Sequence, residues 1–99
     1  MKNFFVYLVC NPLNTVIYTG VTSNLPKRIN QHKMKTFPNA FTAKYNCTKL
    51  VWYQELGTHD KAFKREKQIK AGSRRKKIAL IEEVNPEWKD LSSEWDEVL

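Results

Sequence analysis

Four side chains that can hold and activate a phosphodiester lie within the first third of this chain. Tyr7 and Tyr18 fall in two short runs that are typical of the two strands of a hairpin. Arg28 and His32 follow at i, i+4 spacing, which places them on one face of a helix. Two phenols, a guanidinium and an imidazole can together bind a phosphate, oppose its charge and move a proton. Taken singly, each is more often an ordinary strand or surface residue.

Glu66 is the acidic residue that is hardest to explain as a simple surface side chain. It lies three residues after Phe63 and three before Ile69, on the apolar stripe of its expected helix. Burial of a carboxylate is costly unless a cation offsets its charge. A bound metal ion is one explanation, an ion pair with Arg28 is a second, and a tilt of Glu66 into solvent is a third. The residues leave all three open.

The charge of the chain is uneven along its length. The 99 residues include 17 Lys and Arg and 10 Asp and Glu, which gives a net charge of +7. Residues 1–84 hold 16 basic and 5 acidic side chains, or +11, while residues 85–99 hold 1 and 5, or −4. Between Lys61 and Lys77, nine basic residues accompany one acid. Such a surface attracts polyanions, nucleic acid above all, although a charged helix that only keeps the domain soluble is the plainer alternative.

Length and composition predict a single small domain inside the cell. A hydrophobic fraction of 41% with 12% aromatic residues is enough to build a core without metal or disulfide support. Cys10 and Cys47 match no metal-ligand spacing, so we expect both to be reduced thiols. The chain shows no apolar leader and no run of membrane-spanning length. We therefore expect a cytoplasmic protein that does not associate with a membrane.

The residue pattern predicts an α+β fold, a small three-stranded antiparallel sheet flanked by helices in the order β-β-α-β-α-α. Gly20, near the end of the second strand, predicts a bulge or a close approach of the backbone to another group. Residues 36–48 are expected to form a loop with at most one helical turn. Strands are expected over residues 4–10, 15–21 and 49–55, and helices over 25–35, 59–71 and 74–84, the second ended by Gly72 and the third capped by Ser73.

The end of the chain differs in character from the rest. Asn85 and Pro86 are expected to begin a last short helix, because asparagine caps helices and proline suits their first turn. Residues 1–91 then form the domain, and the acidic residues 92–99 are expected to form a frayed tail.

Taken together, these residues resemble the GIY-YIG nuclease family, and more closely its small members similar to the N-terminal nuclease domain of the excision-repair incision subunit. The resemblance spans about residues 4–91, with Val6-Tyr7-Leu8 as the first motif and Tyr18-Thr19-Gly20 as the second. It implies that Arg28 and His32 are the family's helix arginine and histidine. It also matches Glu66 to the metal-binding glutamate and Asn85 to the late asparagine.

Three positions depart from the family pattern. Val6 replaces the first Gly-Ile pair, and Thr19 stands in place of isoleucine. Lys70 is followed by Ala71, where the family has tryptophan. The last difference leaves the specificity for substrate open.

The resemblance implies a DNA endonuclease that hydrolyses a phosphodiester with one divalent cation, Mg²⁺ or Mn²⁺. Glu66 is the expected metal ligand, since one carboxylate with several waters is a common way to hold Mg²⁺. Arg28 would hold the phosphate with its forked guanidinium. The general base is open among Tyr7, Tyr18 and His32: a phenol needs nearby positive charge, which Arg28 and the metal could supply, while His32 titrates in the right range unaided. We favour Tyr7 as the base, with His32 assisting through a hydrogen bond and Tyr18 positioning the water or phosphate. Asn85 would orient the site.

A second set of residues is expected to contact nucleic acid. Gly20 would let the backbone approach the substrate, and basic side chains would bind phosphates without reading bases. We therefore expect cleavage directed by DNA structure rather than sequence, in repair or processing, with RNA left open as a substrate. The protein would be a monomer or weak homodimer, and a protein partner is a candidate source of specificity. The expected phosphate contacts are Lys64, Lys67, Lys70, Arg74 and Arg75.

Two other functions compete with this one. The first is a nucleic-acid-binding module that keeps the fold but cuts weakly or not at all. The second is a protein-interaction domain whose acidic tail meets a basic partner. The charge distribution supports the first, while the presence of every matched catalytic position speaks against it.

Overall fold

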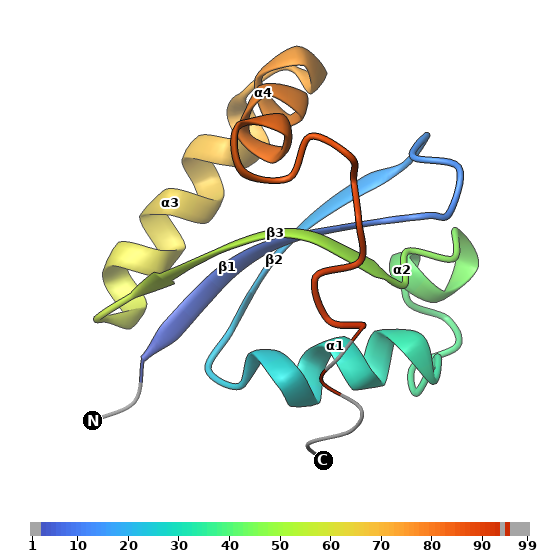
Figure 1. Ribbon diagram of the computed structural model, residues 1–99. Coiled ribbons are helices and arrows are strands. Elements are labelled where there is room, and N and C mark those ends of the chain that lie inside the picture. Colours follow the sequence, from blue (N-terminus) through green and yellow to red (C-terminus); the bar gives the residue numbers. More distant parts are fainter. Residues whose placement is uncertain (1–2, 94, 96–99) are drawn as a thin grey trace.

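A three-stranded antiparallel sheet with its first strand in the middle organises the molecule (Figure 1). The structure is a computed structural model that describes residues 3–93 and 95. The strands are β1 (Phe4–Cys10), β2 (Ile17–Thr22) and β3 (Lys49–Leu56), in the spatial order β2-β1-β3. The predicted α+β class and antiparallel sheet are confirmed. β2 begins two residues later than expected, because the turn after Cys10 is closed by Asn11, whose side chain accepts from the Thr15 and Val16 backbone N–H groups.

The helices follow the predicted order with one short addition. They are α1 (Leu25–Lys33), α2 (Phe41–Lys44), α3 (His59–Ala71) and α4 (Arg74–Val84). Three begin at a polar side chain that accepts a hydrogen bond from the backbone N–H three residues on, as expected of an N-cap. α2 is the helical turn expected within residues 36–48. The three capping residues are Asn24, Thr58 and Ser73.

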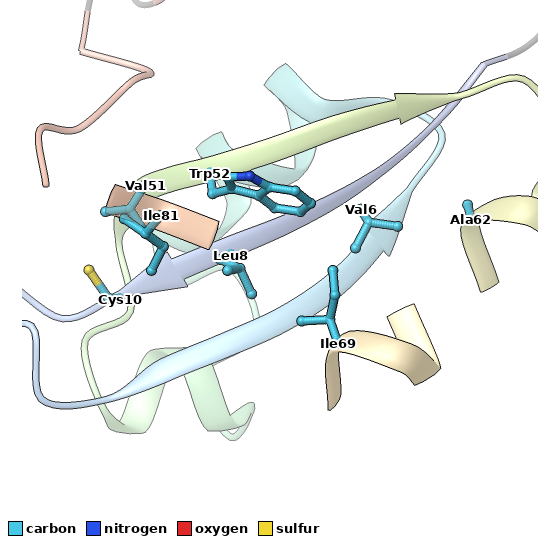
Figure 2. Close-up of a cluster of buried hydrophobic side chains, with 8 residues drawn as sticks. All are labelled: Val6, Leu8, Cys10, Val51, Trp52, Ala62, Ile69 and Ile81. Carbon is cyan, nitrogen blue, oxygen red and sulfur yellow. The ribbon is translucent and has the colours of Figure 1, made fainter. Parts of the chain in front are cut away.

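Successive residues of β1 face opposite sides of the sheet, and each side is covered by different helices. Val6, Leu8 and Cys10 pack against residues of α3 and α4, as Figure 2 shows. Tyr7 and Val9 point the other way and pack against Leu25 and Ile29 of α1, which lies on the other side of the sheet from α3 and α4 (Figure 1). The central strand is therefore buried on both faces, and a residue of β1 can reach a functional site on either side.

Several expected helix ends differ from the structure. α1 stops at Lys33, and Lys35 adopts a left-handed φ of 51°. Gly72 ends α3 as expected, but with a φ of −76° in extended backbone, because the chain turns directly into the cap of α4. Val84, the last residue of α4, is 65% exposed, so the end of this helix does not pack into the core.

The expected last helix is absent from residues 85–91, which form turns. Trp88 has a left-handed φ of 56°, which interrupts any helix there. The Asp90 carboxylate instead fixes this segment: it accepts from the Lys33 ammonium at 2.7 Å, the Ser92 hydroxyl at 2.6 Å and the Leu50 backbone N–H at 3.3 Å. Together these bonds tie the segment to α1 and β3.

The expected frayed tail is corrected at the residues of it that the structure describes. Ser92 is only 2% exposed, and Trp95 packs against the core cluster around Tyr7. The Trp95 ring also meets Tyr53 of β3 edge-on, at 6.0 Å. Residues 94 and 96–99 lie outside the described residues.

Of the helices in the described part of the chain, none has the length and apolar character needed to cross a membrane.

Candidate active site

A hydrogen-bonded chain of three side chains links β1, α1 and α2. The Tyr7 hydroxyl lies 2.9 Å from His32 Nε2, and His32 Nδ1 lies 3.0 Å from the Thr42 hydroxyl. Tyr7 is fully buried and its ring centroid is 5.7 Å from that of His32. In a neutral imidazole one nitrogen donates a hydrogen bond and the other accepts one. The tautomer of His32 therefore sets the direction in which a proton can pass between Tyr7 and Thr42. Thr42 carried no signal in the sequence that distinguished it from other loop residues.

Burial sets the protonation of this chain. Desolvation raises the pKa of Tyr7 to about 12, against the opposing effect of the Arg28 guanidinium. Desolvation also lowers the pKa of His32 to about 4, and repulsion from Arg28 acts in the same direction. His32 therefore does not titrate near neutrality as the sequence suggested, because it is enclosed and lies beside a cation. At neutral pH the pair consists of a phenol and a neutral imidazole.

Gly20 makes room for the Tyr7 ring. The two residues lie opposite each other in the β1–β2 register, and a Cβ built on Gly20 would lie 2.4 Å from the Tyr7 hydroxyl oxygen. The close approach predicted at Gly20 is therefore present, and its neighbour is Tyr7. This gives Gly20 a positioning role, while a contact between Gly20 and nucleic acid stays a prediction.

A cavity of about 240 Å³ brings three of the predicted residues together. Tyr18, Arg28 and His32 line it, with Lys35 on the same wall. The Arg28 side chain is half-buried, and its Nε donates to Gln31 Oε1 at 3.2 Å. This hydrogen bond holds the guanidinium at the cavity wall. The cavity therefore presents a cation, a phenol and the imidazole to an anionic ligand.

Glu66 comes from α3 and is only 15% exposed at its side chain. Its carboxylate pairs with Lys70 Nζ at 3.3 Å rather than with Arg28, so the ion pair considered from the sequence is replaced by one within the helix. Its charge reaches Tyr7, where it contributes to the raised pKa of the phenol. No group of three or more His, Cys, Asp and Glu side chains gathers around a metal position in the described part of the chain. A lone carboxylate nevertheless fits Mg²⁺, which keeps most of its waters.

Asn85 lies apart from these residues. It is 5% exposed, and its Nδ2 donates to the carbonyls of Val51 at 3.1 Å and Lys89 at 2.9 Å. Its Oδ1 accepts from the Lys89 backbone N–H at 3.0 Å. The bond to Val51 places Asn85 at β3, which is one edge strand of the sheet. Tyr18 lies on β2, the other edge strand, and β1 runs between the two. The structure gives it the role of fixing the turn after α4 to β3, and its part in catalysis stays a prediction.

The basic residues singled out in the sequence are exposed along α3 and α4. Lys67 lies over the Phe63 ring at 4.4 Å, and Arg74 Nη2 donates to the Asn14 carbonyl at 2.9 Å. Lys70 is engaged with Glu66. The exposed set is Lys64, Lys67, Lys70, Arg74 and Arg75.

The sheet order and the tyrosine, arginine, histidine and glutamate set define a GIY-YIG domain. The family model described as "GIY-YIG catalytic domain" matches residues 3–79, so the chain belongs to the GIY-YIG family. The predicted resemblance is thereby confirmed. The family consists of nucleases that generally depend on a divalent metal and act on nucleic acid.

Small proteins from several bacteria are similar over most of this chain. A "UPF0213 protein" of Syntrophus aciditrophicus is 35% identical over 86 residues, which cover 87% of this chain and 95% of that protein. A UPF0213 protein of Staphylococcus saprophyticus is 35% identical over 88 residues, covering 84% of this chain and 99% of that protein. The solution NMR structure of a UPF0213 protein from Bacillus halodurans has the same fold, with a TM-score of 0.56, 24% identity, and coverage of 93% and 97%.

Proposed function

We propose that this protein is a metal-dependent endonuclease that hydrolyses a phosphodiester bond of DNA. The observation that carries the proposal is the Tyr7–His32 hydrogen bond of 2.9 Å, made beside a cavity that Arg28 lines. Membership of the GIY-YIG family supports it. A water oxygen would form a bond to phosphorus while the bond to the leaving oxygen breaks, and each residue has a task in that exchange.

Arg28 binds the phosphate in this proposal. Its guanidinium lines the cavity, and a hydrogen bond to Gln31 restricts its movement. A held guanidinium can form two parallel hydrogen bonds to a phosphate and oppose the charge that develops in the transition state. Tyr18 lines the same cavity and would position the phosphate or the attacking water.

Tyr7 and His32 act together as the base. A phenol with a pKa of about 12 is protonated at neutral pH and cannot accept a proton unaided. Because Tyr7 is fully buried and does not line the cavity, a rearrangement on substrate binding must first bring the attacking water to its hydroxyl. Tyr7 would then accept a proton from that water while it passes its own to His32 Nε2, which then carries the charge. The Thr42 hydroxyl, 3.0 Å from Nδ1, accepts from the resulting imidazolium. The relay needs neutral His32, and its lowered pKa provides that form.

Glu66 would hold the divalent metal, Mg²⁺ or Mn²⁺. The bound ion supplies charge neutralisation at the phosphate and the leaving oxygen. Glu66 offers a single, mostly buried carboxylate, and carboxylate oxygens are the ligands that such ions prefer. The Lys70 ammonium pairs with this carboxylate at 3.3 Å and, with its side chain 52% exposed, can move aside.

The exposed basic residues of α3 and α4 would position the DNA through its phosphates. Such contacts do not read bases, so we propose cleavage directed by nucleic-acid structure, in repair or processing in the cytoplasm. One site of this kind cuts one strand at a time.

Nicking of supercoiled plasmid tests the proposal. We expect conversion to the open circle with Mg²⁺ or Mn²⁺ but not with EDTA, and loss of conversion in Glu66→Gln and Arg28→Ala. Glu83→Gln on α4 and Lys89→Ala in the segment after it change exposed residues that have no assigned role, and they serve as matched controls for charge. DNA binding without metal-dependent nicking by the wild type would instead support a binding module that does not cut.

A further inference from the structure

Three exposed aromatic side chains stand beside the cavity that Arg28 lines. Phe37, Phe41 and Tyr45 are 58%, 47% and 50% exposed, and we call them the aromatic ledge. The Phe41 ring lies 4.6 Å from that of Tyr45. On its other side it stacks on Tyr18 at 5.9 Å, with 29° between the ring planes. Phe37 and Phe41 also line the cavity, so the ledge continues directly from the candidate active site.

The position of these rings is not explained by the core. Single exposed apolar residues are common in soluble proteins, but a contiguous group next to polar side chains marks a binding surface. The two core clusters of the described residues contain none of the three ledge residues. About half of the surface of each of these residues therefore faces water, at the place where a substrate would enter.

The surroundings of the ledge are strongly basic. Residues 25–48 contain five Lys and Arg and no Asp or Glu, and the first acidic residue of the chain is Glu55. Lys35 and Arg28 share the cavity with the ledge, and Lys44 is exposed on α2 beside it. A ligand that fits must be anionic and must also carry flat apolar surfaces.

An unpaired nucleotide has both properties. In a duplex each base is covered above and below by its neighbours, whereas an unpaired base can stack on an aromatic side chain. An apolar protein surface would cover the rings but would bury Arg28 and Lys35 without counter-charges, which is costly. A nucleotide places its base on the rings and its phosphates on these cations.

We propose that the aromatic ledge binds unpaired bases of single-stranded nucleic acid, so that the substrates of the site contain unpaired nucleotides. That the bound nucleic acid is also a substrate rests on the proposed nuclease function, whereas its binding to the ledge does not. The ledge would hold one or two bases while the adjoining phosphate enters the cavity beside Arg28.

Binding measured without metal tests this inference separately from cleavage. The probe is a fluorescein-labelled oligothymidylate of about 15 nucleotides, near the upper site size of small single-strand binders. A blunt-ended DNA duplex of the same length is the fully paired probe, and fluorescence anisotropy in EDTA gives both Kd values. Phe41→Leu keeps an apolar side chain but removes the stacking ring. Phe63→Leu on α3 is the matched control, since Phe63 is 43% exposed against 47% for Phe41.

We expect Phe41→Leu to raise the Kd for the single strand roughly tenfold and to leave the Kd for the blunt-ended duplex unchanged. Tyr45→Ala, at the outer end of the ledge, should weaken the single strand alone as well, without touching the cavity lining. Phe63→Leu should change neither. Equal weakening of both probes by Phe41→Leu and Tyr45→Ala, or unchanged single-strand affinity, would overturn the inference.

Further results distinguish this inference from a contact between copies of the chain and from the proposed nuclease function. If Phe41→Leu alters only the concentration dependence of sedimentation, the ledge is a contact between copies of the chain and the inference fails. Ledge-dependent binding without metal-dependent nicking would refute the nuclease and keep the ledge. Metal-dependent nicking by the wild type, together with a single-strand Kd that the ledge substitutions leave unchanged, would support the nuclease and refute the ledge.

Discussion

The lowered pKa of His32 makes the stability of the protein depend on pH in a defined window. His32 has an ordinary pKa of 6.5 in the unfolded chain and about 4 when folded, because burial and Arg28 disfavour the imidazolium. Between these values the unfolded state binds one more proton at His32, so stability falls as pH falls. A difference of about 2.5 in pKa corresponds to a loss of at most about 3 kcal/mol, and partial exposure reduces it.

Urea unfolding of wild type and His32→Gln between pH 7 and pH 4 isolates this contribution. Glutamine can accept from the Tyr7 hydroxyl and donate to Thr42, but it does not titrate. We expect the difference in unfolding free energy between the two proteins to change by about 2–3 kcal/mol across the window. The contribution of Asp90, whose pKa is held below 3.8 by Lys33 and Ser92 despite burial, is lost at lower pH and falls outside it.

A difference that stays constant from pH 7 to pH 4 would refute the reasoning. It would mean that His32 binds a proton equally well in both states and is therefore not enclosed with Tyr7 as described. The lowered pKa of His32 also bears on cleavage. The nicking rate plotted against pH should show no inflection near pH 6.5 from His32, because the imidazole is already neutral there and the relay uses that form.

Two further substitutions test positions on either side of β1. Gly20→Ala should destabilise the protein by about 1–3 kcal/mol in urea unfolding, because its Cβ would lie 2.4 Å from the Tyr7 hydroxyl; Gly57→Ala, where nothing lies within 4 Å, is the control, and equal effects would contradict the packing. Asn85→Ala should cost about 2–4 kcal/mol of unfolding free energy, since three backbone groups lose their partner. Nicking per folded molecule of the same variant tests the catalytic role expected from the sequence: a loss would support that role, and unchanged nicking would contradict it.

Local chemistry explains why much of the fold was predictable. The continuous apolar run of β1 and the polar caps Thr58 and Ser73 act over a few residues, so their structural consequences can be predicted from the sequence. The order of the elements along the chain and the i, i+4 placement of Arg28 and His32 on one helix face follow from the same local rules, whereas the pairing of β1 with β3 joins distant segments. The last helix failed because the hydrogen bonds of Asn85 to β3 and of Asp90 to α1 outweigh a local preference for helix.

The properties that decide the chemistry depend on contacts between distant segments. His32 meets Tyr7, 25 positions earlier in the chain, and Thr42 from α2, and this enclosure lowers its pKa below the value that its residue type suggests. The sequence by itself determined which functional groups are present and on which elements they lie. Only the tertiary structure decided their protonation and their partners, because burial and electrostatic interaction depend on distances that packing sets.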